Sequence, residues 1–174
     1  MLLRALLLLL LMPAPALAVA RGFHPPATEM ERKLDSIIMH VQDDGELPKY
    51  ILRGGKQNNV RDAMLADMFT PELMKAFRDV EANTVYTRCG GQYQPGEDCG
   101  INYNPITCLK FERGAYLYRT ESAVPYKEGE YNALIAMKLL DGEQIVANYM
   151  MVKVGGQWKL DGVDCAIDGD DFNL

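Results

Sequence analysis

The last third of the 174-residue chain constrains the fold most, because it has the pattern of antiparallel strands joined by tight turns. Two stretches, Tyr131–Leu140 and Gln144–Val154, are rich in β-branched, aromatic and large apolar residues. Asp141-Gly142 between them is a preferred two-residue hairpin turn, and Gly155-Gly156 supplies a second turn before a strand at Gln157–Asp164. We expect these strands to form the sheet on which the rest of the chain packs.

Both faces of this predicted sheet are mainly apolar. Two-residue turns fix the register, so that alternate residues share a face. One face would carry Tyr131, Ala133, Ile135, Met137, Val146, Asn148, Met150, Val152, Lys159 and Asp161, and the other Leu134, Ala136, Ile145, Ala147, Tyr149, Met151, Trp158 and Leu160. Such a sheet must be covered on both sides, by helices on one and by more chain or a second subunit on the other.

The first half of the chain has helical periodicity instead. Thr28 and Glu31 match a capping box, and the apolar residues that follow at helical spacing predict a first helix over 29–42. Asn58-Asn59 can cap a second helix that reaches Met68. Thr70-Pro71-Glu72 begins a third, with a hydroxyl at the N-cap and Pro in the first turn.

Two further strands are predicted at Thr84–Arg88 and Tyr116–Ser122, on either side of a loop-like stretch between Cys89 and Cys108. A long loop in a compact domain is usually functional or pinned, and the cysteines indicate pinning. Together these elements predict an α+β fold. Its N-terminal helices would pack on a curved antiparallel sheet of about four to five strands, in a cone-like roll.

The N-terminus has the layout of a secretory signal peptide. One positive charge, Arg4, precedes an apolar run from Ala5 to Met12, and Ala16-Leu17-Ala18 matches a small-x-small cleavage site. The run is short for a bilayer crossing, although an uncleaved anchor is the alternative. We therefore expect a periplasmic or secreted protein without membrane attachment after cleavage. Its expected parts are a signal peptide at 1–18, an extended lead-in at 19–28, a single α+β cone-like domain at 29–165 and an acidic tail at 166–174.

Four cysteines, Cys89, Cys99, Cys108 and Cys165, follow the expected cleavage site. An even number in an oxidising compartment predicts two disulfides, with three connectivities open. We favour Cys89 with Cys99, which would close a Gly-rich loop, and Cys108 with Cys165, which would tie that region to the end of the sheet. A metal site is not expected, because the spacings lack close ligand pairs such as C-x-x-C.

The charge balance argues against some classes of partner. The chain carries 24 acidic and 18 basic residues, and loss of Arg4 with the signal peptide changes the formal net charge from −6 to −7. An acidic chain without a basic cluster is a poor candidate for binding nucleic acid or anionic lipid. The acidic residues after Asp164 do not match a calcium-loop pattern, so we expect a solvated tail and no cofactor.

Several short motifs resemble a known superfamily. N-terminal helices, an antiparallel sheet and a last hairpin reading Gly-Gly-Gln-Trp158-Lys159-Leu160-Asp161-Gly162-Val163 look like the nuclear-transport-factor-2-like (SnoaL-like, cystatin-like) cone fold. Within it, Phe69-Thr70-Pro71-Glu72-Leu73 and the loop from Asp98 to Tyr103-Asn104-Pro105-Ile106 are similar to an exported bacterial domain family of unknown function. The resemblance implies a pocket between sheet and helices, which members use for isomerase or dehydratase chemistry, ligand binding or protein contacts. The paired cysteines and the insertion around Pro95 depart from the superfamily pattern.

Three residues are candidates for lining such a pocket. Asp161 could be a carboxylate in an apolar site, with Asn148 near it on the same face and Tyr131 available as a donor. The simpler interpretation places Asp161 at the sheet edge, solvated or bonded to a neighbouring loop. No nucleophile motif supports a hydrolase.

We therefore expect an exported, non-catalytic binding module that recognises a small apolar ligand or an envelope protein partner. Apolar residues on both sheet faces and a loop fixed by disulfides suit this role. One alternative is an isomerase- or dehydratase-type enzyme that uses a pocket carboxylate. Another is an immunity or inhibitor protein of the cell envelope, and a homodimer through the sheet is also open.

Overall fold

A computed structural model describes residues 22–56, 58–94, 97–109, 114–127 and 130–166. The expected signal peptide, residues 19–21 of the lead-in and most of the acidic tail lie outside these ranges. The elements, in chain order, are α1 Glu29–Asp43, α2 Leu47–Arg53, α3 Asn59–Met68, α4 Pro71–Cys89, β1 Tyr116–Lys127, β2 Glu130–Leu139, β3 Ile145–Val154 and β4 Gln157–Cys165.

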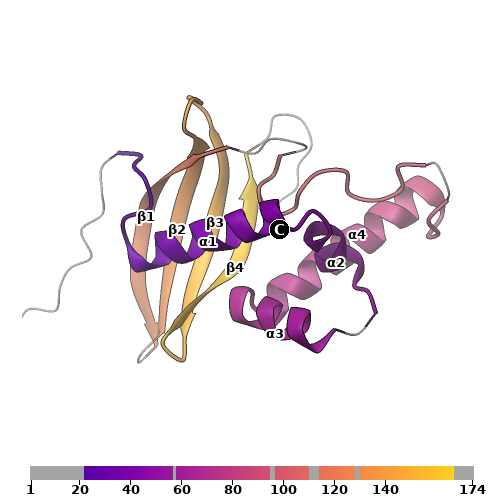
Figure 1. Cartoon of the computed structure of the whole chain (residues 1–174), viewed down its shortest axis with the longest axis horizontal. Helices are drawn as coiled ribbons and strands as arrows, with labels where there is room; N and C mark the ends of the chain where they lie inside the picture. The colour runs from indigo at the N-terminus through magenta and orange to yellow at the C-terminus, as the bar shows by residue number, and fades with distance from the viewer. Residues whose placement is uncertain (1–21, 57, 95–96, 110–113, 128–129, 167–174) are drawn as a thin grey trace, which may run out of the picture.

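The strands form one antiparallel sheet in the order β1-β2-β3-β4, so each strand pairs with its neighbour in sequence. Helix α1 crosses one face of this sheet, and α2, α3 and α4 lie beyond its β4 edge (Figure 1). All four helices precede the strands, which confirms the predicted α+β class. No helix in the described residues is long and apolar enough to span a membrane.

Helix α1 begins where the sequence predicted. The Thr28 hydroxyl accepts from the Glu31 amide, and the Glu31 carboxylate accepts in turn from the Thr28 amide. The apolar stripe of α1 is buried against the sheet and the other helices, with Leu34 and Ile38 fully inaccessible. The capping box therefore fixes the start of the helix, and the apolar stripe determines the face that it buries.

The lead-in is attached to the edge of the sheet. His24 exchanges two backbone hydrogen bonds with Tyr118 of β1, at 3.0 and 2.8 Å. Its imidazole Nε2 lies 3.8 Å from the buried carboxylate of Glu31. The segment before α1 thus extends the sheet beyond its β1 edge by one isolated bridge.

The predicted strand at Thr84–Arg88 is wrong, because these residues form the end of α4. The β-branched residues gave a local strand signal, but the side chain of Val85 is buried and the hydroxyl of Thr84 donates to the Val80 carbonyl within the helix. The helix continues to Gly90, whose left-handed φ of 64° ends it.

Two β-bulges change the faces predicted for the sheet. Met137 pairs with Ala147 and Lys138 with Ile145, which leaves Val146 as an extra residue in β3. Met151 pairs with Leu160 and Met150 with Gly162, which leaves Asp161 extra in β4. The predicted grouping is therefore wrong, because one inserted residue reverses the side of every residue beyond it. The helix-facing side carries Tyr118, Ala133, Ile135, Met137, Ala147, Tyr149, Met151 and Leu160.

Side chains fill the space between α1 and the sheet. Leu34 and Ile38 of α1 belong to one buried cluster with Met137 and Tyr149 of the sheet, and none of the four is exposed by more than 1%. The hydroxyl of Tyr149 donates to the carbonyl of Ile106 at 2.7 Å. The interior at this level is therefore packed core.

The structure contains the two disulfides that the sequence favoured, Cys89–Cys99 and Cys108–Cys165. The first joins the end of α4 to the loop that follows it. The second joins a later part of that loop to the last residue of β4. Both are compatible with folding in an oxidising compartment.

Candidate functional site

An open groove of about 400 Å³ lies between the end of α1, helix α2 and the loop at 101–109. Its lining residues are Val41, Gln42, Gly45, Pro48, Lys49, Leu52, Arg53, Ile101, Asn102, Tyr103, Asn104, Thr107 and Leu109. A site of this size falls in the range that holds small molecules in proteins. The resemblance implied a pocket between sheet and helices, whereas no lining residue of this groove belongs to a described strand.

The helical wall of the groove comes from a short turn between α1 and α2. The amide of Asp44 donates to the His40 carbonyl at the end of α1, and the amide of Leu47 donates to Asp44 at 2.9 Å. Pro48 lies in the first turn of α2. Amides in this turn have no acceptor within the helix, so the lack of an amide hydrogen in proline costs no hydrogen bond there. Helix α2 therefore presents Lys49, Leu52 and Arg53 to the groove.

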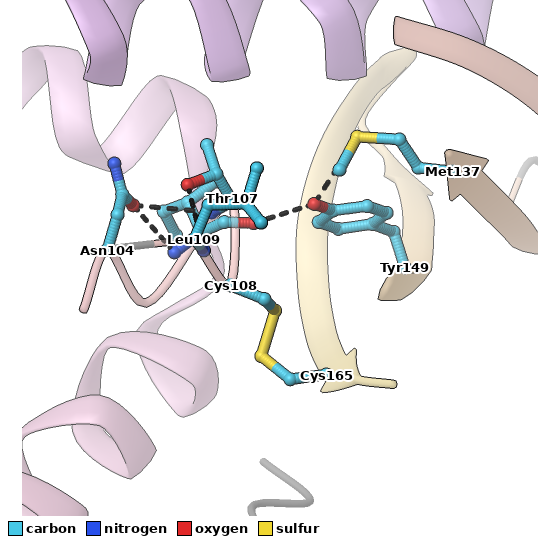
Figure 2. The surroundings of a disulfide bond; sticks show 8 residues. Asn104, Thr107, Cys108, Leu109, Met137, Tyr149 and Cys165 are labelled. Atoms are coloured by element: carbon cyan, nitrogen blue, oxygen red, sulfur yellow. Dashed lines mark hydrogen bonds between the residues drawn. A yellow bond between two sulfur atoms is a disulfide. The ribbon is translucent and has the colours of Figure 1, made fainter. Parts of the chain in front are cut away.

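The loop wall is shaped by Asn104. Its side-chain oxygen accepts hydrogen bonds from the amides of Ile106 and Thr107 at 2.9 and 3.3 Å. Its carbonyl accepts from the Cys108 amide, and its amide donates to the Leu109 carbonyl. Figure 2 shows this local network beside the disulfide. Asn104 thereby closes the segment into a compact turn. Asn side chains commonly accept from backbone amides two or three residues further along the chain.

The sheet fixes that turn in place. Cys108 is bonded to Cys165 of β4, and Tyr149 of β3 donates to the carbonyl of Ile106 (Figure 2). Burial is the main reason that the pKa of Tyr149 lies well above its usual value, so the phenol stays a donor. Two attachments to neighbouring strands thus hold the loop wall.

A buried carboxylate, Glu81 of α4, fixes the opposite end of the loop. It accepts from the Ile101 amide at 2.6 Å, from Arg53 Nε at 2.7 Å and from the Tyr93 hydroxyl at 2.5 Å. Burial, and then the hydrogen bond to Glu81 and its charge, raise the pKa of Tyr93 to about 12. Glu81 therefore connects α2, α4 and the loop at the base of the groove.

The groove combines an apolar floor with positive charge. Val41, Leu52 and Ile101 are buried, whereas Lys49 and Arg53 have side chains exposed by 66% and 39%. No described lining residue is acidic, although the chain as a whole is acidic. Both cations are paired with carboxylates outside the lining, Lys49 with Glu46 at 3.4 Å and Arg53 with Glu81 at 2.7 Å. This arrangement suits a ligand with an apolar body and a negative group.

The three residues predicted to line a pocket lie elsewhere. Asp161 accepts a hydrogen bond from the Thr70 hydroxyl at 2.6 Å, which agrees with its interpretation as a carboxylate bonded to a neighbouring segment. Asn148 pairs with Asp164 rather than with a residue beside Asp161, so the predicted neighbours are separated by the bulge. Tyr131 pairs with Lys153 nearer the other end of the sheet. None of the three lines the groove.

One group of potential metal-ligating atoms occurs in the described part of the chain, formed by Cys89, Glu97 and Cys99. Both sulfurs are joined to each other in the disulfide, so neither is a thiolate ligand. The metal interpretation therefore gains no support from this cluster.

Sequence reasoning missed the groove because its two walls are about 50 residues apart and share no motif. The available signal was indirect: an unusually long loop with a cysteine at each end, and an Asn104-Pro105 turn inside it. Comparisons with protein families, with curated proteins and with solved structures found no match for this chain.

Proposed function

We propose that this protein is an exported, non-catalytic binding module that holds a small amphipathic anion in the groove between α2 and the loop at 101–109. The observation that carries the proposal is the lining itself. It joins buried Val41, Leu52 and Ile101 to the cations Lys49 and Arg53, whose carboxylate partners Glu46 and Glu81 lie outside the lining.

The construction of the walls supports a binding role. The loop is attached at one end through Glu81 and at the other through Cys108–Cys165 and Tyr149. A site that is already formed loses little conformational entropy when a ligand enters, which favours affinity. A long loop fixed at both ends is also where binding residues commonly occur.

The enzyme alternative depended on Asp161. That carboxylate is engaged by Thr70 at the start of α4, which supports a structural role for it. The immunity or inhibitor alternative stays a prediction. Export to the periplasm or outside the cell is part of the proposal, supported by the disulfides and by the signal-peptide pattern.

A set of three matched probes tests this function. Decanoate, decanol and decyltrimethylammonium share one alkyl chain and differ in charge. We expect decanoate, below its micellar concentration, to raise the melting temperature of the disulfide-bonded mature protein more than the other two. Titration calorimetry should then give a dissociation constant that weakens with added salt, because screening reduces the contribution of the cations.

Two variants locate the binding. Lys49→Ala should weaken decanoate binding about two- to fivefold, the range expected for one exposed charge. Lys75→Ala, on the exposed surface of α4, is its matched control. Gly45→Phe should abolish binding, since Gly45 lines the groove and open space lies where its side chain would begin; Gly22→Phe is the control. Equal shifts with the cationic probe, or binding unchanged in Gly45→Phe, would contradict the proposal.

A further inference from the structure

The sheet face turned away from α1, here called the outer face, has no described helix over it (Figure 1). The register assigns Arg119, Ser122, Val124, Asn132, Leu134, Ala136, Asn148, Met150, Val152 and Asp164 to this face. Leu134 and Met150 at its centre are 40% and 42% exposed, and Val124 is 52% exposed. Exposed apolar side chains at the centre of a sheet indicate a contact surface.

The paired strands arrange these side chains in rows across the sheet. The central row runs from Ser122 through Leu134 and Met150 to Gly162. The next row begins with Arg119 on β1, continues through Ala136 and Asn148, and ends with Asp164 on β4. One row thus has an apolar centre, and its neighbour has opposite charges at its two ends.

We propose that the outer face binds a second copy of this chain, sheet against sheet, about a two-fold axis parallel to the strands. Such an axis places β1 of one protomer over β4 of its partner. Within the central row, Leu134 would then lie over the partner's Met150. Within the charged row, Arg119 would lie over the partner's Asp164. Each contact occurs twice, as two-fold symmetry requires.

The side chain of Arg119 is held by contacts within its own protomer and remains 31% exposed. Its guanidinium donates to Glu121, at 2.7 Å from Nε, and stacks on the ring of Phe23 at 4.6 Å. Two-fold packing about an axis perpendicular to the strands would instead use Lys159 opposite Asp164. Lys159 is tied to another element instead, because its ammonium donates to the Ala66 carbonyl of α3. The axis parallel to the strands is therefore favoured.

The area is consistent with a reversible dimer. Four strands about 4.8 Å apart and about nine residues long cover roughly 600 Å². A standard specific interface uses about 800 Å² per partner. The outer face approaches this size without reaching it, so we expect association in the micromolar range. Two sheets packed in this way keep their strands within about 30° of each other.

This inference does not depend on the groove, and sedimentation velocity of the mature, oxidised protein over about 1–200 µM tests it. The wild type should shift from monomer to dimer with concentration. Leu134→Glu should weaken the dimer at least tenfold. Val60→Glu makes the same change at an 82% exposed position on α3 and should have no effect.

A charge exchange tests the pairing. Arg119→Asp and Asp164→Arg should each weaken the dimer severalfold, and the double variant should regain most of the wild-type affinity. Arg119 and Asp164 lie on opposite edge strands, about 14 Å apart from strand spacing, so rescue inside one protomer is not expected. Circular dichroism and the melting temperature establish that each variant is folded.

A wild-type protein that remains monomeric throughout would overturn the proposal. Equal loss of the dimer in Val60→Glu, or no recovery in the double charge exchange, would also overturn it.

Discussion

The hydroxyl of Thr70 donates to the carboxylate of Asp161 across 2.6 Å and accepts from the amide of Leu73. One side chain therefore caps α4 and contacts the bulge of β4. The backbone of Thr70 adds a second contact with β4, because its amide donates to the Leu160 carbonyl at 3.0 Å. Thr70 thus joins helix and sheet through two hydrogen bonds to β4, while a third caps α4.

Thr70→Ala should lower the free energy of unfolding by about 1–2 kcal/mol, because it removes an N-cap and leaves Asp161 without its donor. Asp161→Asn should cost less, since the amide retains an oxygen acceptor. Urea denaturation measures both. Thr87→Ala, which removes an exposed hydroxyl bonded to the Asn83 carbonyl, is the control and should change stability by less than about 0.5 kcal/mol.

Glu31 should make the protein sensitive to acid. Burial tends to raise its pKa, but hydrogen bonds from the Thr28 amide, the Thr120 hydroxyl and the Ala27 amide lower the net pKa below the usual 4.5. A carboxyl group whose pKa is lower in the folded state stabilises the protein above its unfolded pKa, and this contribution is lost as the pH falls through the folded value. Unfolding free energy should therefore decline below about pH 4.5.

Glu31→Gln should lower stability at pH 7 by about 1–3 kcal/mol and give a flatter pH dependence below pH 5. Urea midpoints at several pH values measure this. Glu46→Gln, at a position exposed by 73%, should keep the wild-type slope. An equal slope in wild type and Glu31→Gln would refute the assignment.

The two disulfides should differ in their contribution to stability. Loop-closure entropy gives about 4 kcal/mol for Cys108–Cys165, which spans 57 residues, and about 3 kcal/mol for Cys89–Cys99, which spans 10. Paired Cys→Ser variants and guanidinium denaturation check the order. Loss of Cys108–Cys165 should also weaken decanoate binding, because that bond holds the loop wall of the groove.

Gly100 lies too close to Glu81 to carry a side chain. A Cβ added there would be 2.3 Å from Glu81 Oε1 and 2.8 Å from Arg53 Nη2. Gly100→Ala should therefore separate the ion pair and lower the unfolding free energy by about 1–3 kcal/mol. Gly22→Ala, which meets no atom within 4 Å, should be neutral in the same thermal-unfolding measurement.

Local signals predicted much of the architecture. Thr28 with Glu31 predicted the start of α1, and Gly155-Gly156 predicted the turn between β3 and β4, where both glycines adopt positive φ. Each of these features depends on a few adjacent residues, so it can be predicted from the sequence of this chain alone. The α+β class followed from their order along the chain.

The register and the site depended on distant contacts. Val146 and Asp161 are bulge residues. When both faces of a strand carry apolar residues, the sequence shows no alternation of polar and apolar positions, so an inserted residue cannot be detected from it. The groove needs Lys49 and Asn104, far apart in the sequence, to line one space in the folded molecule, which no local spacing encodes. Asp161 was predicted as a pocket carboxylate from its place in a strand, but the sequence does not show that it accepts from Thr70 at the cap of α4.

The bond between Cys108 and Cys165 closes a covalent ring that contains all four strands. A protease that cuts once inside this ring, for example at Asp141-Gly142, would yield two polypeptides that still migrate as one species. They would separate on an electrophoresis gel only after reduction. A nick in the sheet would therefore go unnoticed under oxidising conditions, and a protein exposed to extracellular proteases would keep its strands together after cleavage.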